Sequence, residues 1–328
     1  MHVKTLRTTL VERTFSKEKS VFADWRLDLD NTAKLCIEHD LQLWHADKFI
    51  KDDEDREKTA DVMRKYATQI KNMFIQSTCR STYPQISAND FSALSNRVEF
   101  PDAPGQGVFK SSMVDTQYIA ANNNTAPMPG LDPSLHVRYK FIEAIARVAQ
   151  AKFTNQQRVG TTWEAVEKLF EDHLIPKYPW EPWQEFRESY CYTLEVNDVL
   201  DANLDGITGL ISHYFAPRKS FMSRKDVISL FTKDSNANMA EKVALYCFGM
   251  SKMTVVNETK EAKKYDRIEL AEMCEMICRC AESKFKGMGV SPASQLEVLL
   301  DELFVVTGFQ RRDVNVQHEE LSESDDEY

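Results

Sequence analysis

The stretch Leu270–Phe285, LAEMCEMICRCAESKF, has an earlier counterpart at residues 139–153, YKFIEAIARVAQAKF. When Arg279 is aligned on Arg147, 132 residues earlier, a glutamate, an isoleucine, an alanine and a Lys-Phe pair coincide as well. Both stretches carry apolar residues at the spacing of a helix that buries one face. They therefore predict related helices in the two halves of the chain.

A second match lies upstream of each of these helices. The segment MSRKDVISL at residues 222–230 repeats the pattern of ISANDFSAL at residues 86–94, 136 residues earlier. Two matches in the same order and at nearly the same separation indicate a duplicated unit of roughly 130 residues. The length agrees, because 328 residues correspond to about two domains.

The composition favours helices and narrows the range of partners. Hydrophobic residues make up 42% of the chain, and only 10 Gly and 11 Pro are present, which favours an all-α fold over a turn-rich β architecture. The net charge of −10 argues against binding to nucleic acid or to an acidic membrane, because either would repel the average surface. No run approaches the ~18 apolar residues of a membrane span, and the N-terminus lacks the apolar core of a secretory signal.

The seven cysteines sit mostly in apolar helical settings, which predicts reduced thiols in the core or at its edge. Cys274 and Cys278 share one helix face, but Cys280 points to another side. Because a structural zinc site needs four convergent ligands, the cysteines predict no metal site.

The first half shows a helix, a loop and a second helix in succession. Residues 52–76, DDEDREKTADVMRKYATQIKNMFIQ, predict one long helix with an acidic first turn and a single apolar stripe. A loop, the apolar Ile86 and a capping box that joins Ser87 to Asp90 follow. This is the pattern of an EF-hand, whose eighth loop position pairs with a partner hand through a short strand. We call each such helix–loop–helix unit a hand; in the third hand, Met222 takes the eighth position.

The repeats predict two EF-hand-like lobes of two hands each, with flanking helices and at most short β-pairs. The N-terminal arm has two interpretations, a disordered tail or an extended segment that becomes ordered on a partner. The acidic tail is expected to be solvated. The expected divisions are an arm at 1–20, a first lobe at 21–175, a Pro- and Trp-rich connector at 176–184, a second lobe at 185–310 and the tail at 311–328.

One segment resembles a calcium loop but is better explained as a helix. Asp201, Asn203 and Asp205 match the opening of a calcium loop, D-x-N-x-D-G. The twelfth residue, where calcium needs a bidentate glutamate, is Ser212. The same residues also continue a helical apolar stripe, so we expect a helix here.

The loops of the four hands are also poor in calcium ligands. With Ile268 at position eight, the fourth loop begins at Glu261 and ends at Glu272, but two cations and an aromatic ring occupy positions between them. The second loop ends at Glu143 or, when aligned on the fourth hand, at Lys140. We therefore predict no calcium site of physiological affinity and no cofactor. The least unsuitable calcium ligands are Asp201, Asn203, Asp205, Glu261 and Glu272.

Two groups of residues are candidates for binding a partner. Trp180 and Trp183 lie in the connector, where they either pack the two lobes together or form an exposed platform for a ligand. Basic residues in the third hand, together with the arm, offer local positive charge on an acidic protein. These residues are Arg218, Lys219, Arg224 and Lys225.

Several segments recur in an order that resembles a known group of proteins. They are VFADWRLDL, the helix with Trp44, YPQISANDFSAL, YKFIEAIARVAQAKF, NDVLDANLDGITGLISHYF, and YCFGMSKMTVV followed by RIELAEMCEMICRCA. Over residues 20–305 the chain resembles divergent EF-hand-like proteins of ciliated and flagellated protists. The resemblance implies a structural component of the axoneme, on or inside doublet microtubules or in an attached complex. The resemblance would normally imply calcium sensing as well, but the residues at the calcium-ligand positions here depart from the pattern of the family.

These observations favour a calcium-independent adaptor of the cilium or flagellum that binds microtubules or other axonemal proteins. Tubulin or a partner helix held in an apolar groove would be its partner. The alternative is a calcium-sensing regulator of ciliary motility. An enzyme is disfavoured, because the sequence has no Gly-rich phosphate loop, no nucleophile elbow and no metal-spaced pair of histidines.

Overall fold

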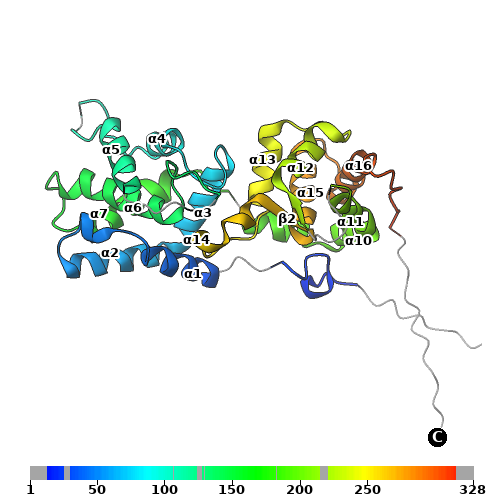
Figure 1. Cartoon of the computed structure of the whole chain (residues 1–328), viewed down its shortest axis with the longest axis horizontal. Helices are drawn as coiled ribbons and strands as arrows, with labels where there is room; N and C mark the ends of the chain where they lie inside the picture. The colour runs from blue at the N-terminus through cyan, green and yellow to red at the C-terminus, as the bar shows by residue number, and fades with distance from the viewer. Residues whose placement is uncertain are drawn as a thin grey trace, which may run out of the picture.

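The computed structural model describes residues 13–25, 30–105, 107–123, 128, 130–181, 183–214 and 221–314. These residues form helices and one two-stranded sheet, so the fold is all-α as predicted. The helices gather into two lobes that lie side by side along the long axis of the molecule (Figure 1).

The first lobe is built from seven helices, and two short helical turns lead out of it. A π-helical turn extends α6, and another extends α7. The bounds are α1 (Asp30–Leu41), α2 (Asp53–Lys65), α3 (Ala67–Cys79), α4 (Ala88–Arg97), α5 (Ser111–Asn122), α6 (Arg138–Ala149), α7 (Thr162–Leu169), α8 (Ile175–Lys177) and α9 (Trp183–Phe186).

The second lobe contains the remaining helices and both strands. Its longest helix, α15, begins and ends where the sequence predicts. The bounds are α10 (Leu194–Ala202), α11 (Leu204–His213), β1 (Phe221–Ser223), α12 (Arg224–Ser229), α13 (Glu241–Met250), α14 (Glu258–Glu261), β2 (Arg267–Glu269), α15 (Leu270–Phe285) and α16 (Pro292–Phe304).

The same pairs of helices pack together in both lobes. Helix α2 packs on α7 as α10 packs on α16, and α5 packs on α6 as α13 packs on α15. The pairs α6 with α7 and α4 with α5 likewise correspond to α15 with α16 and α12 with α13. The four predicted hands fall on the helix pairs α3–α4, α5–α6, α11–α12 and α13–α15, with two such pairs in each lobe.

Both lobes also contain the same helix break. The chain leaves helical geometry at Tyr66, between α2 and α3, and at Asn203, between α10 and α11, with nearly equal φ of −103° and −111°. The Tyr66 ring stacks on Phe170 at 4.2 Å, whereas the Asn203 amide forms two hydrogen bonds with the backbone of Arg312. The single helix predicted over residues 52–76 is therefore wrong; these contacts outside the helix hold a break in its middle.

Side-chain contacts repeat at the aligned positions. Arg147 Nε donates to Glu143 Oε1 at 2.7 Å, and Arg279 Nε donates to Glu275 Oε1 at 2.8 Å. Each guanidinium also lies over a phenylalanine ring, at 4.2 Å in the first lobe and 4.3 Å in the second. The sequence match at these positions thus corresponds to a match in the contacts that the residues make.

The N-terminal segment packs on the second lobe before the chain enters the first (Figure 1). Arg13 forms an ion pair with Asp198 at 2.9 Å, and Phe22 and Trp25 are buried. Residues 21–25, which were expected in the first lobe, therefore lie on the second, because their apolar side chains are buried there against Tyr192 and Arg187. The remainder of the predicted arm, residues 1–12, lies outside the described residues.

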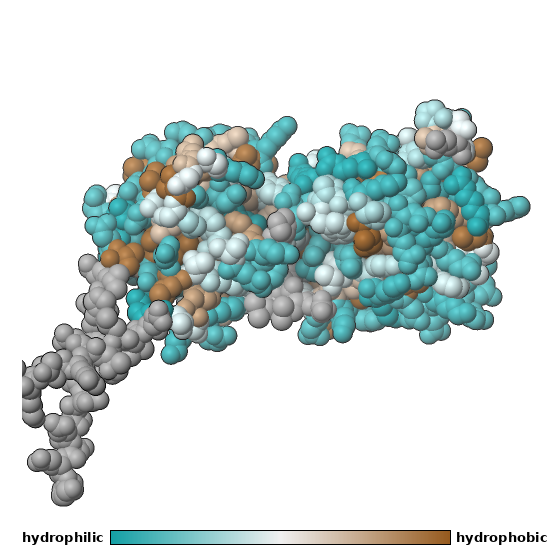
Figure 2. Space-filling view, turned by 180° about the vertical axis from the view of Figure 1, so that it is seen from behind, coloured by the Kyte–Doolittle hydropathy of each residue, from teal (hydrophilic) through white to brown (hydrophobic). Residues whose placement is uncertain are grey.

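Little apolar surface remains exposed. On the face shown in Figure 2, apolar residues form small separate patches on a mostly polar surface. All seven cysteines are buried free thiols, as predicted. Among the described residues, no helix is both long enough and apolar enough to cross a membrane.

Candidate functional site

The loops of the hands meet in pairs at the predicted eighth positions. In the first lobe, Ile86 and His136 exchange two backbone hydrogen bonds of 2.9 Å. In the second lobe, Met222 pairs with Ile268 at the centre of the β1–β2 ribbon. The pairing of His136 selects the alignment in which the second loop ends at Lys140.

The twelfth residues of the first and third loops act as helix caps. Asp90 accepts hydrogen bonds from the backbone N–H of Ser87 at 3.2 Å and from the Thr82 hydroxyl at 3.0 Å. In the third hand, the Ser223 hydroxyl donates to Asp226, whose own backbone N–H donates to that hydroxyl at 3.3 Å. These carboxylates therefore stabilise the first turns of α4 and α12.

The twelfth residue of the second loop is a cation. The Lys140 ammonium donates to Asn122 Oδ1 at 2.7 Å and to the Pro133 carbonyl at 3.1 Å. It thereby joins the end of α5 to the loop that precedes α6. A side chain that carries a positive charge has no electron pair to offer a calcium ion.

In the fourth loop, an ammonium group binds the carboxylate that a calcium ion would need. Glu272 accepts from the backbone N–H of Met253 at 2.9 Å and of Glu269 at 3.0 Å, and it binds the Lys252 ammonium. Both side chains of the ion pair are only 5% exposed. Burial lowers the pKa of Lys252, and the neighbouring Glu272 opposes that shift. The positive charge at this position belongs to the protein itself.

The other candidate calcium ligands do not converge. Asp201 and Asp205 are exposed on either side of the break at Asn203, and Asp205 pairs with Arg312 at 3.0 Å. Glu261 binds Lys264. Within the described ranges, no group of three His, Cys, Asp or Glu side chains is arranged to hold a metal ion.

The junction between the lobes contains a buried arginine. Arg138, the first residue of α6, bonds Asp40 of α1 at 2.5 and 3.2 Å, and both side chains are 1% exposed. The same guanidinium donates to the carbonyls of Val255 at 2.9 Å and Val256 at 2.8 Å, which lie between α13 and α14, ahead of the fourth loop. The segment that leads from α13 into the fourth loop thus packs against the first lobe, where Figure 1 shows α14 near α1 and α3.

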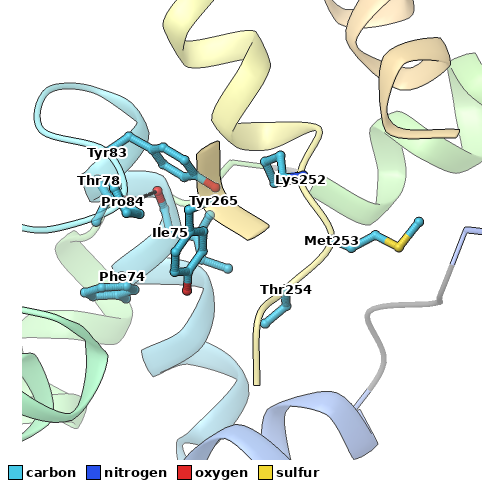
Figure 3. A pocket seen from close by; sticks show the side chains of 9 residues that line it. All are labelled: Phe74, Ile75, Thr78, Tyr83, Pro84, Lys252, Met253, Thr254 and Tyr265. Atoms are coloured by element: carbon cyan, nitrogen blue, oxygen red, sulfur yellow. Dashed lines mark hydrogen bonds between the residues drawn. The ribbon is translucent and has the colours of Figure 1, made fainter. Parts of the chain in front are cut away.

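A small cavity lies at the same junction. Figure 3 shows its lining, in which Phe74, Ile75 and Thr78 of α3 face Lys252, Met253 and Thr254, which follow α13. The rings of Tyr83 and Tyr265 meet edge to face there, with centroids 5.6 Å apart. Burial raises the pKa of both hydroxyls well above its usual value. Because the volume is about 10 Å³, the cavity is a packing defect of the junction and has no room for an organic ligand.

The connector tryptophans pack the lobes together. Trp183 is buried, with the Lys71 ammonium of α3 5.1 Å above its ring and the guanidinium of Arg187 5.9 Å away. Trp180 is half-buried and donates to the Ile175 carbonyl at 3.2 Å. The contacts of Trp183 therefore join the two lobes, while Trp180 and Trp183 together also line a surface hollow.

The basic candidates divide into three cases. Arg224 donates to the Tyr83 carbonyl at 2.6 Å and pairs with Asp266 at 3.1 Å, so contacts within the chain hold its guanidinium. Lys225 is exposed on α12. Arg218 and Lys219 lie outside the described residues.

Sequence reasoning missed the buried charged residues at the junction: Asp40, Arg138, Lys252 and Glu258. The Asp40–Arg138 and Glu258–Arg138 contacts join residues 98 and 120 positions apart, and no local pattern reports such pairings. One signal was present, because the repeat alignment places Lys140 opposite Glu272. A reversal of charge at an aligned position indicates that the two loops have different partners.

No family model, curated protein or solved structure matches this chain.

Proposed function

We propose that this protein is a non-catalytic structural adaptor of the ciliary or flagellar axoneme, built from two EF-hand-like lobes that work without calcium. Each lobe pairs two helix–loop–helix units through residues at the eighth loop position, which is how EF-hands pair. The EF-hand arrangement would thus be retained as a scaffold while its loops no longer serve an ion.

The Lys252–Glu272 ion pair is the observation that carries this proposal. A calcium loop needs an ionised glutamate at position twelve to bind the ion through both oxygens. Here one carboxylate oxygen accepts from the backbone of Met253, and the other accepts from Lys252 and Glu269. A calcium ion would have to displace the buried Lys252 ammonium. Because that ammonium is part of the chain, it loses no translational freedom when it pairs with Glu272.

The partner is expected to meet the polar outer surface of the protein. In the first lobe, α7 packs on α2 and α6, and in the second, α16 packs on α10 and α15. Helices of the chain itself thus cover the apolar faces on which a partner helix would lie. Axonemal proteins, including tubulin, are the proposed partners on the strength of the sequence resemblance. Lys225 is the exposed basic candidate among the described residues.

Fractionation of cilia tests this proposal. Cilia that carry the tagged protein are demembranated with detergent, and the axonemes are then washed with increasing salt, with and without calcium. The adaptor is expected in the insoluble axoneme in both conditions. Release with the detergent-soluble fraction contradicts a stably bound component, and retention that depends on calcium supports the sensor instead.

A further inference from the structure

We propose that the segment joining the helices of the fourth hand forms a clasp that caps helix α6 of the other lobe and holds the two lobes as one rigid body. The clasp consists of residues 253–266, which run from the end of α13 into the predicted ion loop. Its contacts are independent of any assumed function, but its place in a fourth hand rests on the proposed EF-hand arrangement.

The starts of the four exiting helices show what the clasp replaces. Three of these helices carry an acid at the third position that returns to the start of its own helix. Asp90 and Glu272 accept from the backbone N–H groups of Ser87 and Glu269, and Asp226 binds its N-cap serine. Helix α6 has Lys140 at that position, and its N-cap residue makes no side-chain hydrogen bond.

The missing carboxylate comes from the other lobe. Glu258 Oε2 accepts from the backbone N–H of Arg138, the first residue of α6, at 2.8 Å. The second carboxylate oxygen, Oε1, accepts from the Tyr265 hydroxyl, so both oxygens of Glu258 have hydrogen-bond partners. Glu258 itself is only 1% exposed. A carboxylate at a helix N-terminus also interacts favourably with the helix dipole.

The Arg138 side chain fixes the clasp from the opposite direction. Its guanidinium forms an ion pair with Asp40 of the first lobe and donates two further hydrogen bonds to the carbonyls of Val255 and Val256. Without the clasp these donors would be buried without acceptors, which is costly for a charged group. Lys252 anchors the beginning of the clasp by binding the Arg267 carbonyl and Glu272.

Hydrogen exchange on the full chain tests the clasp, because the substitution and the readout lie in different lobes. Glu258→Ala is expected to speed exchange of the amides at the start of α6 about tenfold, as for loss of a helix cap. Glu261→Ala is the matched control, because Glu261 lies on the same short helix and contacts the exposed Lys264 of its own loop. The clasp is contradicted if both variants leave α6 unchanged or if both affect it equally.

A rescue variant separates this inference from the proposed EF-hand arrangement. In the double variant Glu258→Ala with Lys140→Glu, the first lobe regains an acid at the third position of α6, as in the other three hands. By their pattern this acid would accept from the backbone N–H of the N-cap residue Val137, one residue before Arg138, and slow exchange of the first turn of α6 should return. An effect of Glu258→Ala without rescue would support the clasp but contradict the equivalence of the four hands.

Discussion

Buried charges at single positions carry most of what distinguishes the two lobes. Lys252 is the clearest case, because its ammonium neutralises Glu272 inside the fourth loop. A buried ion pair adds little net stability over apolar packing, but removal of one partner leaves the other charge buried alone. The pair is therefore sensitive to single substitutions, and this makes its role measurable.

Lys252→Met should lower the free energy of unfolding by about 3 kcal/mol, because Glu272 loses its cation while it remains buried. Urea denaturation at neutral pH measures the difference. Lys242→Met, on the exposed side of helix α13, which ends just before Lys252, is the control and should change stability by less than about 0.5 kcal/mol. Equal stability of the two variants would mean that Lys252 does not neutralise the loop.

His136 gives the first lobe a dependence on pH that the second lobe lacks at the aligned position, Ile268. Burial lowers the pKa of His136 from 6.5 to about 3, and its Nε2–H donates to the Tyr118 carbonyl at 3.0 Å. Between these two pH values, the unfolded chain binds a proton that the folded chain excludes. The stability that the neutral His136 contributes is therefore fully present above pH 6.5 and falls as the pH drops towards 3.

The substitution His136→Ile copies the residue of the second lobe and removes this titration. Below pH 6.5, His136 should cost the wild-type protein about 1.4 kcal/mol of unfolding free energy per pH unit. The variant lacks this contribution, so its unfolding free energy should fall less steeply by the same amount. Denaturation curves at several pH values test the slope.

Among the elements, helix α3 of the first lobe packs directly on helix α13 of the second. Gly249 of α13 lies against the side chain of Cys79 on α3, and a Cβ atom placed there would overlap the cysteine sulfur. Glycine is a poor helix former, so its presence inside α13 is explained by this close approach.

Gly249→Ala should destabilise the protein by about 1–3 kcal/mol, although alanine favours helices more than glycine does. The double variant with Cys79→Ala removes the overlapping sulfur and should recover part of the loss. Thermal denaturation of the two single variants and the double variant forms a complete cycle. Strict additivity of the two effects would show that the residues do not touch.

Local patterns predicted the elements that depend on local physics. Helix α15 follows from its apolar periodicity, and the capped start of α4 follows from Ser87 and Asp90, whose contacts lie within a few residues. The breaks at Tyr66 and Asn203 could not be predicted, because Phe170 and Arg312 hold them from more than 100 residues away. The helical stripe continues across both breaks without a change.

At the scale of the whole molecule, the lobes are joined by three segments that run in both directions. The N-terminal segment packs on the second lobe, the clasp packs on the first, and the connector buries Trp183 between them. We infer that a partner binds to a rigid two-lobe molecule and not to two lobes that move independently on a flexible linker. The duplication could be predicted from the aligned matches. The packing of each lobe's segment on the opposite lobe could not be predicted, because it depends on contacts that the two repeats do not share.

We infer that the protein supplies its own cations and hydrogen bonds at the positions where an EF-hand would bind calcium. Isothermal titration of calcium into the chelator-treated full-length chain is the direct test. Up to about 1 mM calcium, the range of the weakest EF-hand modules, the heats should equal those of dilution. Saturable binding in the micromolar range would contradict the claim.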